Sequence, residues 1–166
     1  MISTGETTAL RYFEDFRVGQ SFDCGAVTVT REEIVAFAER FDPQPFHLDD
    51  EAGKASLFGE LSASGWHTAA LCMRQLVDTV VLDSSSLGSP GVDSLRWLRP
   101  VLVNDRLSVR LQITSLRRSE KRPDLGLVGT RLEARNPRDE PVLTWESTAF
   151  FGCRPAAAPA SDPGRR

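Results

Sequence analysis

A chain of 166 residues is long enough for one well-buried core and too short for two ordinary domains, so we expect a single domain. A formal net charge of -3, with 26% charged and 40% hydrophobic residues, gives the chain no overall attraction to nucleic acid or to an anionic membrane. The three cysteines lie far apart and form no CxxC pair, and no apolar run reaches the length of a membrane span. These features lead us to expect a cytoplasmic protein.

The first regular elements are a strand and a helix. Apolar and polar residues alternate over residues 21–29, which predicts a half-buried strand. Thr30 and Glu33 have the spacing of a capping box, in which each side chain satisfies a free backbone N–H of the other residue. Apolar residues then recur at three- and four-residue steps. We therefore predict a helix over residues 31–41, ended by Pro43.

The segment that follows this helix, Asp-Pro-Gln-Pro-Phe-His, carries a carboxylate at Asp42 and an imidazole at His47. Its two prolines restrict the backbone, so we expect a turn that holds the two side chains at a nearly fixed separation. Preorganised groups of these two types are what general acid/base catalysis requires.

A long helix is predicted over residues 66–81, where apolar residues recur at three- and four-residue steps across more than four turns. We expect it to be the central, buried helix. Ser62 or Ser64 can cap its N-terminus, and Gly65 allows a ligand to approach the backbone closely. Cys72 lies on the apolar stripe, which favours a small buried side chain over a nucleophile.

The remainder of the chain has the pattern of a sheet. After a Ser-, Gly- and Pro-rich loop at 83–91, four strands are predicted at 95–101, 107–114, 125–134 and 142–151, joined by hairpin-length loops. The fold class is therefore α+β: an antiparallel curved sheet wrapped around one long helix.

Both ends of the chain differ in composition from the part between them. Residues 1–10 are small and polar, and residues 153–166 are rich in Pro and Ala. We predict a flexible N-terminal arm at 1–10, one domain at 11–152 and a disordered tail at 153–166.

Three segments carry a resemblance to a known family: FDPQPFHLD at 41–49, SGWHTAAL at 64–71 and LRWLRPV at 95–101. Together they resemble the MaoC-like, or (R)-specific enoyl-CoA hydratase, branch of the hotdog-fold superfamily, over roughly residues 11 to 152. The resemblance implies a single hotdog fold, usually dimeric. The expected partners are an acyl thioester of coenzyme A or acyl carrier protein and a second copy of the chain, with neither nucleic acid nor membrane. We expect no cofactor and no metal.

The resemblance also implies roles for individual residues. Asp42 and His47 match the catalytic pair that positions and activates the water added to the enoyl thioester. Gly65 matches the glycine whose backbone N–H binds the thioester oxygen, and we expect its neighbours Ser64 and Trp66 to take part in binding there.

The chain departs from the family pattern at three positions. Gln44 replaces a common asparagine, Phe46 replaces a leucine, and Ser64 stands where a histidine is common. Candidates for the acyl pocket, which could equally be core residues, are the aromatic side chains Phe46, Phe58, Trp66 and Trp97.

Several alternatives stay open at the level of sequence. The leading hypothesis is an enoyl-thioester hydratase, or the same enzyme acting as a 3-hydroxyacyl dehydratase. The alternatives are a thioesterase on the same fold and a catalytically silent acyl-thioester-binding subunit. The presence of both Asp42 and His47 favours hydration over thioesterase chemistry.

Other titratable residues admit more than one interpretation. His67 is interpreted as structural or substrate-lining. Four polar residues, namely His47, Asp49, Asp50 and His67, match no usual metal spacing. The basic run from Arg117 to Arg122 is either a solvated hairpin loop or a contact for coenzyme A phosphates.

Overall fold

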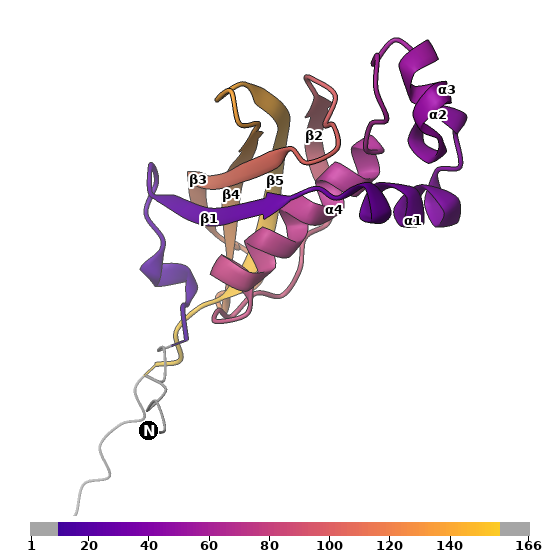
Figure 1. Ribbon diagram of the computed structural model, residues 1–166. Coiled ribbons are helices and arrows are strands. Elements are labelled where there is room, and N and C mark those ends of the chain that lie inside the picture. Colours follow the sequence, from indigo (N-terminus) through magenta and orange to yellow (C-terminus); the bar gives the residue numbers. More distant parts are fainter. Residues whose placement is uncertain (1–9, 157–166) are drawn as a thin grey trace, which may run out of the picture.

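The computed structural model describes residues 10–156, and in it five antiparallel strands curl around one long helix (Figure 1). The strands are β1 (Ser21–Thr28), β2 (Val92–Trp97), β3 (Arg106–Arg118), β4 (Leu125–Arg135) and β5 (Pro141–Gly152). Their order in the sheet is β1-β3-β4-β5-β2, so β1 and β2 form the two edges. The α+β class predicted from the sequence is confirmed.

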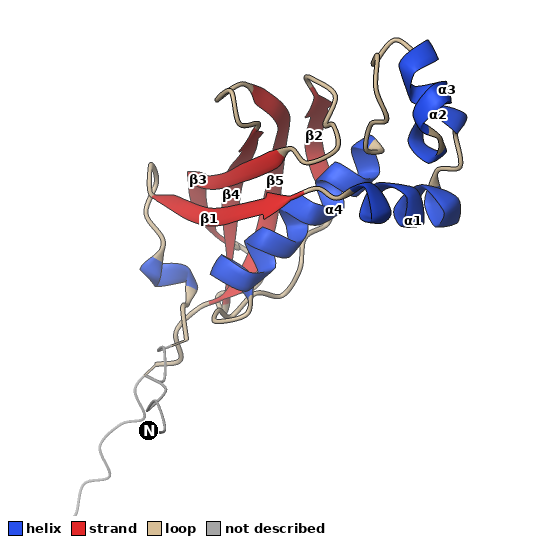
Figure 2. Ribbon diagram, viewed as in Figure 1, coloured by secondary structure: helices blue, strands red, loops and turns tan. Residues whose placement is uncertain are grey.

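The helices fall into two groups, coloured blue in Figure 2. The long helix α4 (Gly65–Leu76) lies against the sheet and continues into the π-helical turn η2 (Val77–Val81). The others, α1 (Arg31–Phe41), α2 (Pro45–Leu48) and α3 (Asp50–Ala55), lie together beyond one end of the sheet, on the side where α4 begins. A short 3₁₀ helix, η1 (Phe13–Asp15), precedes β1.

The core lies between the sheet and α4. Every second side chain of β3 from Leu107 to Ile113 is buried, as the strict alternation in the sequence predicts. Ala69 and Cys72 of α4 are buried in the same core. Cys72 is fully buried, and burial raises the pKa of its thiol to about 12, which agrees with a structural role.

Helix α1 begins and ends as predicted. The Thr30 hydroxyl accepts the Glu33 backbone N–H, and the Glu33 carboxylate accepts the Thr30 backbone N–H at 3.1 Å. The helix ends at Phe41, so Asp42 is the residue that caps its C-terminus. The capping box thus fixes where the helix begins, at the end opposite to Asp42.

Two predictions about the helices were wrong in detail. The segment of Asp42 and His47 is not a turn throughout: Pro45 occupies the first position of the short helix α2, where its missing N–H costs nothing, and His47 lies on that helix. On the long helix, Trp66 is 60% exposed and Met73 is 38% exposed, so the apolar stripe is not buried throughout. Periodicity places residues on one face but does not reveal what covers that face.

Two predictions about the strands also need correction. β2 pairs with β5 rather than with β3, so the connection from β2 to β3 is not a hairpin. β3 extends to Arg118, which places Arg117 and Arg118 in a strand rather than in a loop. The predicted arm and tail lie outside the described residues, apart from Leu10 and residues 153–156.

Candidate active site

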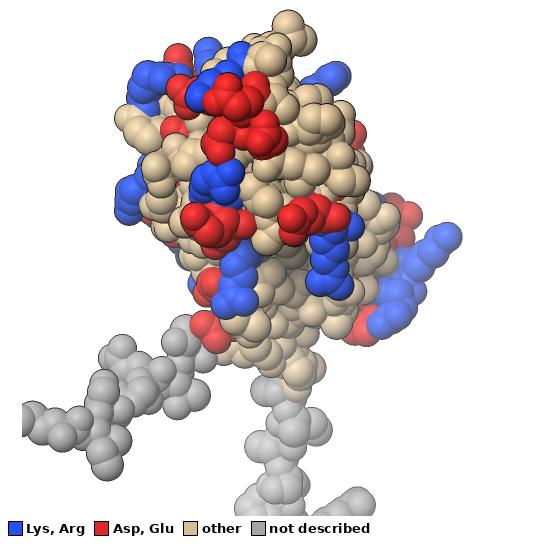
Figure 3. Space-filling model, turned by 45° about the vertical axis from the view of Figure 1, so that its right-hand side comes forward, with Lys and Arg blue, Asp and Glu red and all other residues tan. Residues whose placement is uncertain are grey.

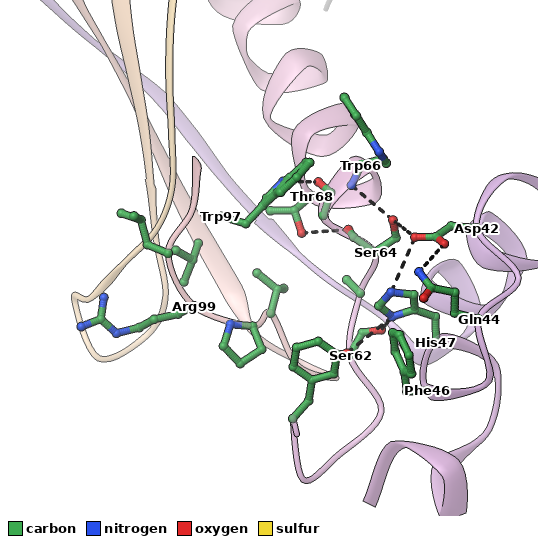
Figure 4. Close-up of a pocket in the computed structure, with 17 residues that line it drawn as sticks. Asp42, Gln44, Phe46, His47, Ser62, Ser64, Trp66, Thr68, Trp97 and Arg99 are labelled. Carbon is green, nitrogen blue, oxygen red and sulfur yellow. Dashed lines mark hydrogen bonds and ion pairs between the residues drawn. The ribbon is translucent and has the colours of Figure 1, made fainter. Parts of the chain in front are cut away.

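A cavity of about 490 Å³ opens at the N-terminal end of α4, beside the junction of α1 and α2 (Figure 4). Its wall combines the α1–α2 junction, the first turn of α4 and the segment that follows β2. Asp42, His47, Ser64, Gly65 and Trp66, the five site residues predicted from the sequence, all line it.

Asp42 and His47 face each other on one side of this cavity (Figure 4). The distance from Asp42 Oδ2 to His47 Nε2 is 3.6 Å, and their side chains are 21% and 6% exposed. The two groups are therefore close enough to act on one water molecule and are largely shielded from bulk solvent.

Both oxygens of the Asp42 carboxylate accept hydrogen bonds from neighbouring side chains. The Ser64 hydroxyl donates to Oδ2 at 2.7 Å, and the Gln44 amide donates to Oδ1 at 2.7 Å. The Ser64 hydrogen bond lowers the pKa of Asp42, with smaller contributions in the same direction from Gln44 and His47, while burial opposes them. Asp42 is thus held in its ionised form.

The other ring nitrogen of His47 fixes the tautomer of the imidazole. His47 Nδ1 lies 2.7 Å from the backbone carbonyl oxygen of Ser62. A carbonyl can only accept, so Nδ1 carries the hydrogen and the neutral ring presents an unprotonated Nε2 towards Asp42 and the cavity.

Gly65 occupies the first position of α4, where a backbone N–H has no partner within the helix. The next amide, Trp66 N–H, donates to the Ser64 hydroxyl at 3.2 Å. Within residues 10–156, no hydrogen-bond acceptor is found for the Gly65 N–H. This amide is therefore the free donor at the positive end of the α4 dipole.

Trp97 explains why residue 65 has no side chain. Its indole N–H donates to the Gly65 carbonyl oxygen at 2.8 Å, and a Cβ added at Gly65 would lie 2.5 Å from the Trp97 ring. The indole ring therefore packs directly on the backbone at the start of α4. Trp97 in turn meets Trp66 edge to face, with ring centroids 5.2 Å apart.

The aromatic side chains proposed for an acyl pocket all line the cavity. Phe46 packs edge to face on both His47 and Phe58, and Trp66 and Trp97 form a second aromatic pair. The cavity thus has apolar walls around a small polar centre, as binding sites for small organic ligands commonly do.

His67 lies outside this arrangement. It is 5% exposed, does not line the cavity and stacks on Phe37 at 4.9 Å between ring centroids. Burial lowers its pKa, although the charge of Glu33 acts in the opposite direction. Its Nδ1 has no hydrogen-bond partner among residues 10–156. Of the two sequence interpretations, this placement favours the structural one.

The other polar clusters lie elsewhere. None of the basic residues from Arg117 to Arg122 lines the cavity, so within one chain the basic run does not reach the site. Arg118 pairs with Glu14 instead. In the part of the chain that the structure describes, no three His, Cys, Asp or Glu side chains are placed to hold a metal ion.

Many charged residues of the described chain form ion pairs of opposite sign. Acidic and basic side chains are interspersed on the face shown in Figure 3, and no large area there carries a single sign. The ion pair between Arg31 and Asp50 is an example. None of the helices within residues 10–156 is long and apolar enough to cross a bilayer.

Sequence reasoning missed four contacts of the site, one of them between His47 Nδ1 and the Ser62 carbonyl oxygen. It did not assign Gln44 and Ser64 to the two oxygens of Asp42, and it did not bring Trp97 onto Gly65. The pairs Ser64–Asp42 and Trp97–Gly65 are 22 and 32 residues apart in the chain, so no local pattern signals them. Gln44 lies inside the segment at 41–49 that resembles the family, and this position was the one sequence feature that could have pointed to its contact with Asp42.

The sequence and the structure of this chain are similar to those of known proteins. A family model described as the MaoC like domain matches residues 15–134. The solved structure of a MaoC-like dehydratase from Rhodospirillum rubrum is 39% identical, with a TM-score of 0.80, and the match covers 87% of this chain and 99% of that one. An (R)-specific enoyl-CoA hydratase from Rhodospirillum rubrum is 28% identical over 112 residues, 64% of this chain and 72% of the relative.

A more distant likeness bears on the fold alone. A Mycobacterium tuberculosis protein whose structure has a double hotdog fold is 23% identical, with a TM-score of 0.74. The match covers 95% of this chain and 48% of that chain. The five-stranded sheet around α4 is thus a single hotdog fold, which confirms the architecture expected from the sequence.

Proposed function

This chain belongs to the family of MaoC-like domains, and from that premise we propose that it is an (R)-specific enoyl-thioester hydratase. It adds water across the 2,3 double bond of an acyl thioester, or removes water from the 3-hydroxyacyl thioester in the reverse direction. Asp42 and His47 are the proposed catalytic residues, and Gly65 provides the proposed donor to the thioester oxygen.

The observation that carries this proposal is the pair of acceptors at the polar centre of the cavity. Asp42 Oδ2 and the unprotonated His47 Nε2 lie 3.6 Å apart. A single water molecule can donate one hydrogen to each of them, which orients its oxygen lone pairs towards a bound substrate. A nucleophilic mechanism needs a serine or cysteine activated by the imidazole. The Ser62 hydroxyl lies 3.5 Å from His47 Nδ1, but that nitrogen carries a hydrogen and cannot take the hydroxyl proton, and the Ser64 hydroxyl donates to Asp42.

The proposed reaction follows from these roles. His47 Nε2 takes a proton from the water as its oxygen bonds to C3 of the enoyl group, and the π electrons move onto the thioester oxygen as an enolate. The free Gly65 N–H stabilises that oxygen. The enolate then takes the proton back from His47 at C2, so that one hydroxyl and one hydrogen have been added in total.

We further propose that the active assembly is a homodimer formed through β2. This strand is an edge of the sheet, its residues Val92 and Trp97 are about half exposed, and Trp97 also lines the cavity. An edge strand with free backbone groups is a template for pairing with a second strand. Light scattering after size exclusion tests this: we expect twice the chain mass of 18.3 kDa, and a monomer for Val92→Lys.

One assay separates the candidate functions. The purified protein is incubated with crotonyl-CoA while the absorbance of the conjugated enoyl group and the release of free thiol are followed together. We expect the enoyl absorbance to fall without thiol release, and chiral chromatography of the product to yield the (R)-3-hydroxy isomer.

The other outcomes contradict the proposal in distinct ways. Thiol release at the rate of substrate loss identifies a thioesterase. If neither signal changes with crotonyl-CoA or with longer and branched enoyl thioesters, while the protein still binds them in calorimetry, the chain is a silent binding subunit.

A further inference from the structure

We propose that Ser64 is a positioning residue, whose hydroxyl ties the Asp42 carboxylate to the first turn of α4 and fixes its orientation towards His47. The effect of this contact on catalysis rests on the proposed hydratase function. The Ser64 hydroxyl is assigned to the carboxylate and not to the thioester oxygen.

The hydrogen bonds of Ser64 leave its hydroxyl only one direction in which to donate. The oxygen accepts the Trp66 backbone N–H at 3.2 Å, as the N-cap of α4. Its single hydrogen therefore points away from that amide, and Asp42 Oδ2 lies 2.7 Å from the oxygen. Ser64 is 1% exposed, so water does not compete for this hydrogen.

The same carboxylate oxygen is the one that approaches His47. Oδ2 accepts from Ser64 and lies 3.6 Å from His47 Nε2, whereas Oδ1 accepts from Gln44. The carboxylate is thus held at both oxygens, and rotation about its bond to Cβ would break both contacts. His47 is the titratable group that faces Asp42 from α2, and the groups facing it from α4 and from the turn are the uncharged Ser64 and Gln44.

This arrangement links the two halves of the proposed chemistry. The hydroxyl that orients the carboxylate belongs to the residue directly before Gly65, whose N–H is the proposed donor to the thioester oxygen. Ser64 is bound both to Asp42 and to the first turn of α4. It therefore keeps the distance between the Asp42–His47 pair and the Gly65 N–H constant. A hydrogen bond to the ionised carboxylate also favours the charged form, so removal of the hydroxyl raises the pKa of Asp42.

The test compares Ser64→Ala with Thr30→Ala. Both variants remove a hydroxyl that caps a helix, but Thr30 caps α1 and does not touch Asp42. The carboxyl carbon of Asp42 is followed by NMR as the pH is lowered, and kcat and KM for crotonyl-CoA are measured over the same range. Thermal unfolding of both variants records the loss of the caps.

For Ser64→Ala we expect the midpoint of the Asp42 titration, and the acidic limb of the pH profile of kcat, to move to higher pH. We also expect kcat to fall by about tenfold to a hundredfold with little change in KM, because the water-activating group loses its orientation. Thr30→Ala lowers the melting temperature but leaves the Asp42 midpoint unchanged. Ser64→Cys, with a weaker donor of similar size, has a midpoint between those of the wild type and Ser64→Ala, and serves if the alanine variant does not fold.

An unchanged Asp42 midpoint in a folded Ser64 variant, or an equal shift in Thr30→Ala, overturns the proposal. The NMR titration needs no turnover, so it also separates this inference from the function itself. If the wild-type protein hydrates no enoyl thioester while the Asp42 midpoint still shifts, the proposed reaction fails and the positioning contact stands.

Discussion

The two ends of the central helix border cavities of opposite character. At its N-terminal end, the cavity of about 490 Å³ contains a carboxylate, an imidazole and a free backbone N–H. Towards its C-terminal end, a second cavity of about 360 Å³ lies between α4, η2 and the sheet, and none of the described residues lining it is Asp, Glu, His, Lys or Arg.

The difference shows what a hotdog domain needs for chemistry and what it needs for stability. Both cavities have apolar walls, so an apolar cavity by itself does not mark a catalytic site. Of these two cavities, only the N-terminal one also contains ionisable side chains held by hydrogen bonds. These side chains and their hydrogen-bond partners come from α1, α2 and the start of α4. Substitutions at the two ends should therefore affect different measurable properties.

The largest effect is expected from the ionisable pair itself. Asp42→Asn keeps the shape of the side chain but removes the charge, and His47→Gln removes the group that transfers the proton. Each should lower kcat/KM for enoyl hydration by about 10²–10⁴-fold, because each removes one general acid/base contribution. Circular dichroism should give the wild-type spectrum for both variants, and a variant with full activity would contradict the assigned role.

A second prediction concerns the contact between Gly65 and Trp97. In Gly65→Ala the new methyl group would come 2.5 Å from the Trp97 ring, so either the start of α4 or the indole must shift. We expect kcat/KM to fall by about 10²-fold, which is the cost of misplacing a reacting group by about 1 Å. The double variant Gly65→Ala with Trp97→Leu removes the clash and should regain part of the lost melting temperature. A single variant with an unchanged melting temperature would count against this close contact.

The third prediction tests the apolar cavity. Leu111 is fully buried on β3 and lines it. Leu111→Ala should lower the free energy of unfolding by about 2–5 kcal/mol in denaturant titrations, because it enlarges a cavity that is already apolar. The acidic limb of the activity profile should stay at the same pH, since no group that faces Asp42 is changed. A shift of that limb would mean that the two ends of α4 are coupled.

The smallest effect is expected from His67. Because burial lowers its pKa, the unfolded chain binds a proton below about pH 6.5 that the folded chain does not, so stability is complete above that pH and falls as the pH drops. Between pH 7.5 and 5.5 the melting temperature of the wild type should therefore drop about 2–4 °C more than that of His67→Phe. An equal drop in both proteins would show that His67 does not contribute.

Local elements were the part of the structure that the sequence predicted best. The capping box at Thr30, the alternation along β3 and the helix over residues 31–41 all occur where the pattern placed them. Each depends on backbone hydrogen bonds and side-chain spacing within a few residues. The pairing of β2 with β5 depended instead on contacts about fifty residues apart, and the pattern of β2 alone does not name its partner.

The sequence by itself determined which groups could do chemistry: one carboxylate and one imidazole five residues apart, placed before a long helix that begins with glycine. The tertiary structure decided how those groups are held. It placed Ser64 and Gln44 on the two oxygens of Asp42, turned His47 Nδ1 to a carbonyl and laid Trp97 over Gly65. The reason is physical: a residue's chemical type is fixed by the chain, whereas a hydrogen bond between residues far apart in the chain is directed only when their segments are packed against each other.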